Sequence, residues 1–361
     1  MRSSDLGNQS VDSFRLSGRN EDDGVSNSIN FVSLDKDAFA YGAVEKLAPG
    51  IRRVIAENPS KFTYHGTGTY IIGEGDVAVV DPGPQIDTHR DALAAALHGD
   101  TVRTILVTHC HADHSPLAAW LHAETGAPTV AFGPHDRPDA ELWNIGTDPE
   151  GFGIAPPSGE PEADTAEQEV KIEESTDHAF VPDIVVDTGD VAATGSIGSI
   201  PWTVTALHTP GHTSNHTCFA FNDGSTTSLF SGDHVMGWST TVVSPPDGDM
   251  AAYFDSLRVV AGRTDDVIIP THGSPVTDPQ TYVRQLVAHR EVREQQIVDA
   301  VRRGLSTIPE MVTELYAAVS VELHKPAARS VLSHLVKLVD EGAITFDSSV
   351  KPRLDSTYSA V

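Results

Sequence analysis

The sequence predicts an α+β protein made of a larger N-terminal domain and a smaller C-terminal one. Short apolar runs typical of buried strands recur as far as Ile269, and several of them end directly in polar residues. From Asp278 onward the apolar side chains instead follow helical spacing. At 361 residues the chain also exceeds the usual size of a single domain, which favours two.

The densest polar cluster follows the apolar run 104–107 and contains His109, His111, Asp113 and His114. His109 and His111 stand two positions apart, so both can face one ion from one side of an extended turn. Asp113 and His114 then offer an oxygen and a nitrogen to a second ion. This density of imidazole and carboxylate suits zinc, with iron or manganese as substitutes. A polar helix start with incidental histidines is the disfavoured alternative.

Further potential ligands follow strand-like runs in the same way. They are Asp81 after the run 77–80, His212 after 204–207, Asp233 after 228–230, and His272 after 267–269. The repetition of one arrangement strengthens the indication of a metal site.

Together these segments resemble the metallo-β-lactamase superfamily of hydrolases. The His-x-His-x-Asp-His signature and its ordered companions run from Asp81 to His272. The resemblance implies an αββα sandwich, in which two mixed sheets lie between helices and the metals bind at strand ends. It also implies the ligand roles: the first metal would be held by His109, His111 and His212, the second by Asp113, His114 and His272, and both by Asp233.

The same resemblance implies the roles of residues around the ions. Asp81 would orient a ligand. The position of His234, directly after Asp233, favours a hydrogen bond close to the metals over ligation. Asp113 and Asp233 are the residues assigned to catalysis, since the bridging carboxylate sets the position of a hydroxide held by both ions. The metals make this hydroxide a nucleophile at neutral pH by lowering its pKa, toward ~7 for a single zinc. His234 and His178 are candidates to help protonate the leaving group.

The ligand set resembles that of glyoxalase II, the lactonases and the nuclease branches. Zinc β-lactamases of the main class carry a cysteine where this chain has Asp233. The expected function is therefore hydrolysis of a small-molecule ester, thioester or lactone. A phosphodiesterase or endoribonuclease is the alternative. A metal-bearing interaction protein without turnover is the third reading, disfavoured because the ligand set is complete.

The C-terminal segment has the outline of a winged helix, and it resembles the winged-helix-bearing lactamase-β-like subgroup, one branch of which contains endoribonucleases. The expected domains are a disordered polar tail at 1–35, a hydrolase domain at 36–290 and a winged helix at 291–361. Helices are predicted from Asp278 to Arg303, from Thr307, and from Pro326 to Glu341, followed by a short strand at 343–346.

The charge of the chain argues against nucleic acid as a partner. Asp and Glu number 51 against 24 Lys and Arg, which gives a net charge of −27. The helix at 326–341 has only Arg329 and Lys337 as basic residues, whereas phosphate binding needs several. We therefore expect a small-molecule substrate. The winged helix is expected to pack on the hydrolase domain or on a second subunit, the latter giving a homodimer.

Other sequence features concern membrane association, the cellular compartment and the acidic segment. No apolar run reaches the length of a membrane span or an export signal, so no membrane association is expected. The two cysteines, Cys110 and Cys218, are too few for a disulfide scaffold, so a cytoplasmic protein is expected. The acidic segment 148–187 is predicted to be a solvated loop, with a lid over the site as the alternative.

Overall fold

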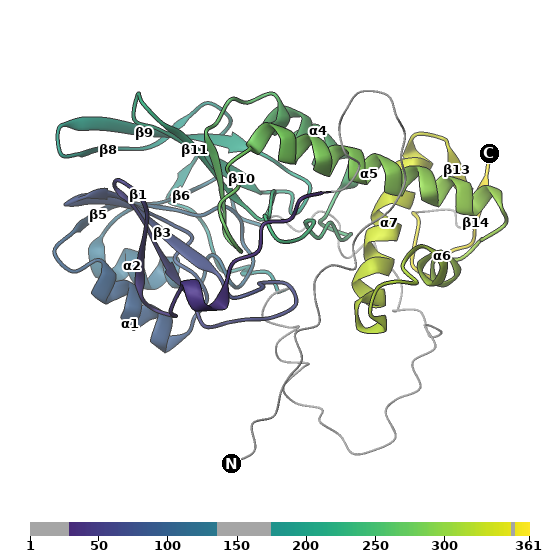
Figure 1. Ribbon diagram of the computed structural model, residues 1–361, viewed down its shortest axis with the longest axis horizontal. Coiled ribbons are helices and arrows are strands. Elements are labelled where there is room, and N and C mark those ends of the chain that lie inside the picture. The colour runs from purple at the N-terminus through teal and green to yellow at the C-terminus, as the bar shows by residue number, and fades with distance from the viewer. Residues whose placement is uncertain (1–28, 136–174, 348–350) are drawn as a thin grey trace, which may run out of the picture. The chain divides into compact units, whose positions relative to one another are not determined.

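Two β-sheets that pack face to face form the core of the larger part of the chain (Figure 1). The computed structural model describes residues 29–135, 175–347 and 351–361. The expected disordered tail before residue 29 and the acidic segment before residue 175 lie outside the described residues. Chain contacts divide the protein into a larger unit, which ends at Val287, and a smaller one, which begins at Ala288. The expected domain boundaries at 35 and 290 stay predictions.

The first sheet has seven strands in sequence order. Its first four strands are antiparallel and the last four, from β4 on, are parallel. The strands are β1 (Val44–Ala48), β2 (Ile51–Ile55), β3 (Gly68–Glu74), β4 (Asp76–Val80), β5 (Thr101–Leu106), β6 (Thr129–Ala131) and β7 (Ile184–Val185).

The second sheet has five strands in the order β12-β11-β10-β9-β8, with only the β11–β12 pair parallel. All strands predicted from apolar runs are present in the two sheets. The strands of the second sheet are β8 (Val191–Ile197), β9 (Ile200–His208), β10 (Thr217–Asn222), β11 (Thr227–Gly232) and β12 (Val267–Pro270).

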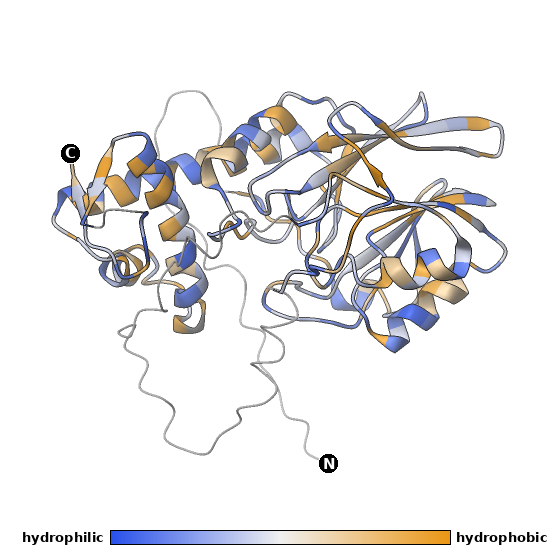
Figure 2. Ribbon diagram, turned by 180° about the vertical axis from the view of Figure 1, so that it is seen from behind, coloured by the Kyte–Doolittle hydropathy of each residue, from blue (hydrophilic) through white to orange (hydrophobic). Residues whose placement is uncertain are grey.

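The apolar core consists of two layers, one on each face of the first sheet. Side chains alternate along a strand, so Tyr70 and Ile72 of β3 pack against the second sheet, while Ile71 packs outward. On that outer face lie α1 (Asp87–Ala96) and α2 (Leu117–Thr125), whose Leu93 and Leu121 are fully buried. Figure 2 shows hydrophobic residues on strands of the sandwich and on the helices beside it.

Helix α4 (Met250–Ala261) lies beside the second sheet on the side away from the first (Figure 1). The order of layers is therefore helix, sheet, sheet, helix, which confirms the predicted αββα sandwich. None of the described helices combines the length and apolar character needed to cross a membrane.

The smaller unit is built around its own apolar core. Helix α5 begins before the division at residue 288 and continues into the smaller unit. The unit contains the predicted helices and the predicted strand of the winged helix. Its elements are the C-terminal part of α5 (Pro279–Arg302), α6 (Ile308–Leu315), a 3-10 turn (Val321–Leu323), α7 (His324–Asp340), β13 (Ile344–Phe346) and β14 (Tyr358–Ala360). Thr307 and Glu310 form a reciprocal capping box at the start of α6, which explains why that helix begins there.

Two local predictions were wrong in detail. Helix α7 begins at His324 rather than Pro326, since proline is tolerated in the first turn of a helix. The acidic segment contains strand β7, which is ordered by pairing with β6.

Helix α1 carries a buried histidine, His89. His89 is 2% exposed, and its Nε2 lies 2.9 Å from Thr69 Oγ1 and 3.1 Å from the carbonyl oxygen of Pro82. Burial lowers the pKa of His89 to about 4, with the Pro82 carbonyl opposing the shift. The folded protein therefore keeps this imidazole neutral at pH values where an unfolded chain would protonate it.

We predict that His89 makes the protein less stable in mild acid. Between pH 6.5 and 4 the unfolded chain binds a proton at this residue that the folded chain does not, so stability falls as pH falls. The contribution between pH 7 and pH 5 is about 2 kcal/mol. Urea unfolding of His89→Gln at both pH values should show a correspondingly smaller pH dependence than the native chain. The exposed His98→Gln serves as the control, and equal pH dependence in all three proteins would contradict the prediction.

Candidate metal centre

The predicted ligands meet at one edge of the sandwich, just beyond the C-terminal ends of the strands. His109 follows β5, His212 follows β9, Asp233 follows β11 and His272 follows β12. Asp81 follows β4 in the same way. Residues that are far apart in the sequence become neighbours here because the strands that deliver them end together.

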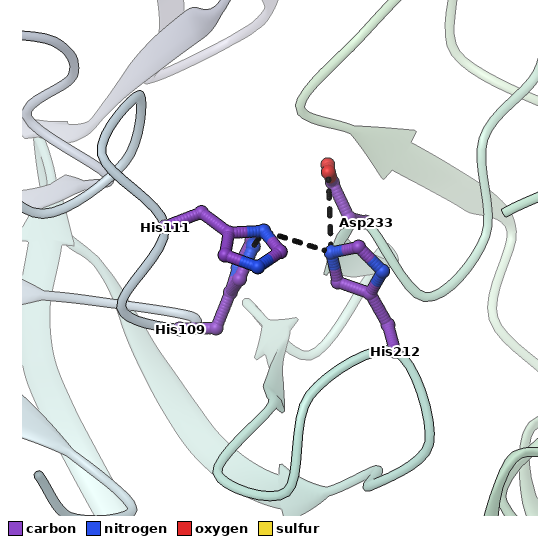
Figure 3. Close-up of side chains that lie close together, drawn as sticks. All are labelled: His109, His111, His212 and Asp233. Atoms are coloured by element: carbon purple, nitrogen blue, oxygen red, sulfur yellow. Dashed lines mark hydrogen bonds and ion pairs between the residues drawn. The ribbon is translucent and has the colours of Figure 1, made fainter. Parts of the chain in front are cut away.

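The first group comprises His109, His111, His212 and Asp233 (Figure 3). Their ligand atoms all lie within 4.8 Å of one another. His111 Nδ1 is 3.0 Å from His109 Nε2 and 3.1 Å from His212 Nε2. Asp233 Oδ2 lies 3.6 Å from His212 Nε2.

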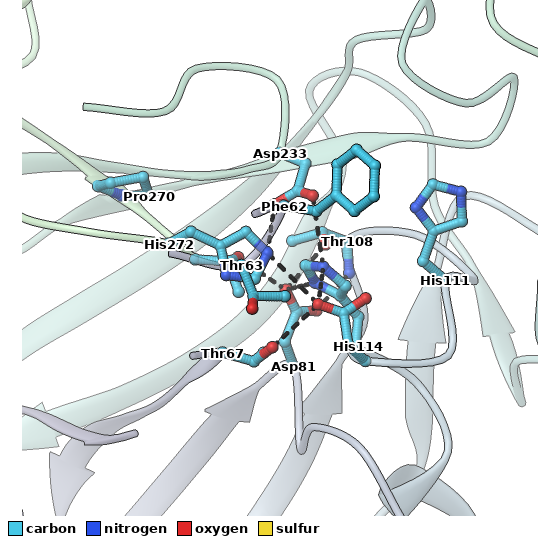
Figure 4. A network of polar contacts seen from close by, with 12 residues as sticks. Phe62, Thr63, Thr67, Asp81, Thr108, His111, His114, Asp233, Pro270 and His272 are labelled. Carbon is cyan, nitrogen blue, oxygen red and sulfur yellow. Dashed lines mark hydrogen bonds and ion pairs between the residues drawn. The ribbon is translucent and has the colours of Figure 1, made fainter. Parts of the chain in front are cut away.

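The second group comprises Asp113, His114 and His272, of which His114 and His272 are labelled in Figure 4. Asp113 Oδ2 lies 3.4 Å from His114 Nε2 and 3.3 Å from His272 Nε2. Asp233 also reaches this group: its Oδ2 is 3.6 Å from His114 Nε2 and its Oδ1 is 3.4 Å from His272 Nε2. The carboxylate of Asp233 therefore stands between the two groups.

The spacing of these atoms fits metal ions. Ligands at about 2.0–2.1 Å from a tetrahedral zinc stand roughly 3.3 Å from one another, and the contacts above run from 3.0 to 3.6 Å. His114 Nε2 and Asp233 Oδ1 are buried atoms without a hydrogen-bond partner among the described residues. Burying a polar atom without a partner costs free energy, and a cation bound between the donors would supply that partner.

The protein fixes which nitrogen four of the five imidazoles present. In four histidines the second ring nitrogen contacts a fixed acceptor, so the nitrogen that faces the group is left free to bind a metal. The contacts are His109 Nδ1 to Thr108 Oγ1 at 3.0 Å, His114 Nδ1 to Asp81 Oδ2 at 2.9 Å, His212 Nδ1 to Val242 O at 2.6 Å, and His272 Nδ1 to Gly66 O at 3.2 Å.

Asp81 ties the metal-binding segments together. Its carboxylate is fully buried and accepts from Thr108 N and Thr108 Oγ1, each at 2.8 Å, as well as from His114 Nδ1. Thr271 Oγ1, next to His272, donates to the same carboxylate at 3.2 Å. Asp81 thus contacts His114 directly, and it reaches His109 and His272 through the threonine before each of them.

Two histidines of the first group, His109 and His111, are held neutral. Burial lowers the pKa of His109 well below its usual range, and the neighbouring histidines add to the effect. Burial, followed by His212, lowers the pKa of His111 to about 3. Neutral imidazole is the form that binds metal, so this group is ready for an ion without losing a proton.

The second group has the opposite electrostatics. Burial alone would lower the pKa of His272, but Asp233 and Asp113 raise it to about 10. Burial also opposes charge on His114, yet Asp113, Asp233 and Asp81 raise its pKa well above the usual value. The carboxylates thus create a buried negative field that stabilises positive charge at this position.

His216 and His234 lie behind the ligands rather than among them. The backbone N–H of Asp233 donates to His216 Nε2 at 3.2 Å, which fixes the start of the bridging residue. The ring of His234 lies 5.1 Å from that of Tyr253, and burial, followed by His212, lowers its pKa to about 3. His178 is exposed and lies beside His135, outside both groups.

Sequence reasoning did not single out the threonines that support the ligands. Thr108 and Thr271 each precede a ligand histidine, and this repeated Thr-His pair is a signal that could have found them. Thr67 donates to Asp113 from the loop before β3, and no comparable pattern marks it.

Comparison with known proteins agrees with this geometry. Residues 65–272 match the metallo-beta-lactamase superfamily, and residues 307–351 match the beta-lactamase associated winged helix domain. The chain is 29% identical over 321 residues to the beta-lactamase-like protein 2 homolog of Drosophila melanogaster, which covers 85% of this chain and 94% of that protein. It is 28% identical over 319 residues to an atrochrysone carboxyl ACP thioesterase of Passalora fulva, and this match covers 84% of this chain and 80% of that protein.

Two solved structures share the fold. A metallo-beta-lactamase family protein of Thermus thermophilus has a TM-score of 0.63 at 22% identity, covering 88% of this chain and 100% of that one. A beta-lactamase domain protein of Burkholderia ambifaria has a TM-score of 0.65 at 20% identity, and the match covers 89% of this chain and 94% of that one. With the match across its sandwich and its His/Asp groups in place, the chain belongs to the metallo-beta-lactamase superfamily of hydrolases and carries that family's associated winged helix.

Proposed function

We propose that the protein hydrolyses the thioester of a small-molecule acyl group at a site holding two metal ions. The observation that carries the proposal is the position of Asp233, whose carboxylate contacts His212 of one group and His114 and His272 of the other. This carboxylate sets the spacing of the two groups. A pair of bound cations would activate a water and polarise the substrate carbonyl.

The preference for a thioester rests on the relatives and on leaving-group chemistry. Relatives at 26–28% identity from Passalora fulva and Aspergillus chevalieri are named atrochrysone carboxyl ACP thioesterases. A thiol has a pKa of about 8.5 and departs as the thiolate, so its loss makes little demand on a proton donor. His234, a candidate donor from the sequence, is neutral and buried, which suits a reaction that does not require one.

Each chain residue has a separate part in the proposed reaction. His109, His111 and His212 would hold one ion, with His109 and His111 as neutral imidazoles, while Asp113, His114 and His272 would hold the other in a negative field. Asp113 and Asp233 bear the charge of that field. Asp81 keeps the ring of His114 turned toward the ions through its contact with Nδ1.

The smaller unit does not suit nucleic-acid binding, and we propose that it has no such partner. Lys337 of α7 contacts Glu294 Oε1 at 2.8 Å and Glu341 Oε2 at 2.9 Å, so its charge is already compensated. The apolar stripe of the same helix, including Val331 and Leu335, belongs to the core of the unit. A homodimer made through this unit stays a prediction.

We predict about two metal ions per chain, with zinc as the proposed metal because the donors are imidazole and carboxylate at tetrahedral spacing. Elemental analysis of purified protein after exposure to zinc, iron or manganese and gel filtration gives the stoichiometry. Zinc at about two per chain is the expected result. Protein that retains none of the three metals would overturn the proposed site.

Replacing Asp233 should abolish turnover without unfolding the protein. Asp233→Asn keeps the shape of the side chain but removes the charge that both groups share. Loss of a direct ligand should cost more than the roughly 10–100-fold in affinity that a supporting partner costs. Metal content and kcat/KM are measured together, with the exposed Asp266→Asn as the control. Full metal content and native turnover in Asp233→Asn would place the bridge elsewhere.

A substrate panel tests the proposed chemistry. Metal-replete protein is assayed with an acyl N-acetylcysteamine thioester, the matched oxyester, a lactone, a β-lactam, bis(p-nitrophenyl) phosphate and single-stranded RNA. The thioester should have a kcat/KM at least about tenfold above the oxyester and lactone, equivalent to about 1.4 kcal/mol. Preferred cleavage of the phosphodiester or of RNA would favour the nuclease reading instead, and Asp233→Asn shows whether any activity belongs to this site.

A further inference from the structure

The loop before β3 reaches the second metal group from outside the metal-binding segments. Thr67, which is labelled in Figure 4, is fully buried and donates its hydroxyl to Asp113 Oδ2 over 2.9 Å. One residue earlier, the carbonyl oxygen of Gly66 lies 3.2 Å from His272 Nδ1. This loop therefore contacts two of the three residues in the second group.

The direction of the Thr67 hydrogen bond is determined by Asn58. The backbone N–H of Thr67 can only donate, and it donates to Asn58 Oδ1 at 2.9 Å. The amide nitrogen of Asn58 is then the atom 2.9 Å from Thr67 Oγ1, and it donates to that oxygen. With this bond accepted, the single proton of the hydroxyl is directed to Asp113, whose carboxylate is an acceptor.

The oxygen that accepts this hydrogen bond is also the one that faces the metal position. Asp113 Oδ2 is the atom 3.4 Å from His114 Nε2 and 3.3 Å from His272 Nε2. The hydrogen bond thus holds the carboxylate in the rotamer that presents Oδ2 to the ion. In the first group the corresponding support comes from other segments, such as the Val242 carbonyl that accepts from His212.

We propose that Thr67, oriented by Asn58, is a positioning residue that acts on the second metal group and not on the first. It fixes Asp113 and so sets the affinity of that group for its ion. This inference rests on the two-metal site of the proposed function, but it concerns a residue outside the ligand set. Supporting partners of this kind typically change metal affinity by about 10–100-fold.

The test compares Thr67→Val with Thr67→Ser. Valine keeps the branched shape and removes the hydroxyl, whereas serine restores the donor. Thr129→Val is the matched control. The Thr129 hydroxyl also donates to an aspartate oxygen, Asp183 Oδ2, over 2.9 Å. Thr129 is buried like Thr67, but it belongs to neither metal group. Metal-free proteins are titrated with Zn²⁺ against a chromophoric chelator and fitted to two sites, and thermal unfolding is recorded without metal.

Thr67→Val should weaken the binding of one of the two ions about 10–100-fold and leave the affinity for the other unchanged. Thr67→Ser should return the affinity to the native value, and Thr129→Val should alter neither ion. Equal weakening of both ions, or the same loss in Thr129→Val, would reduce the hydroxyl to a general structural role and overturn the inference. Unchanged affinities in Thr67→Val would also overturn it. Failure of the native protein to bind either ion would instead contradict the proposed function.

Discussion

The buried carboxylate of Asp81 is the contact on which the metal centre depends. It accepts four hydrogen bonds, from two atoms of Thr108, from His114 and from Thr271, and thereby joins the ends of β4, β5 and β12. Its backbone has a φ of 48°, a conformation that costs a non-glycine residue free energy. The surrounding hydrogen bonds offset this cost, and a geometry that persists under strain is typical of functional sites.

The two halves of the centre solve the same electrostatic problem differently. In the first group, burial is the main effect that keeps His109 and His111 neutral and ready to donate. In the second, carboxylates outweigh burial and hold positive charge on His114 and His272 when no cation replaces it. Asp233 contacts both halves, because its Oδ2 lies 3.6 Å from His212 Nε2 of the first group and 3.6 Å from His114 Nε2 of the second. Such an arrangement favours two cations over one.

The sandwich explains how such a centre can be rigid. Ligands come from loops, yet each loop leaves a strand whose other residues lie in the core between the sheets, as Leu106 and Phe230 do. The loop before His212 passes so close to α4 that it needs a glycine. A Cβ on Gly211 would lie 2.4 Å from the Cα of Tyr253 in that helix. The smaller unit has a separate core, and Lys337 pairs within it, so its charges are used for its own stability.

The sequence by itself identified the candidate ligands and most elements, because the signals are local. Clustered histidines after apolar runs identify the two groups, and the Thr307–Glu310 capping box marks the start of α6 within four residues. Contacts between distant segments were decided only by the tertiary structure. Strand β7 has two residues and is ordered by its neighbour β6. Thr67 meets Asp113 across 46 positions of sequence, and no periodicity or spacing encodes a pairing that packing alone creates.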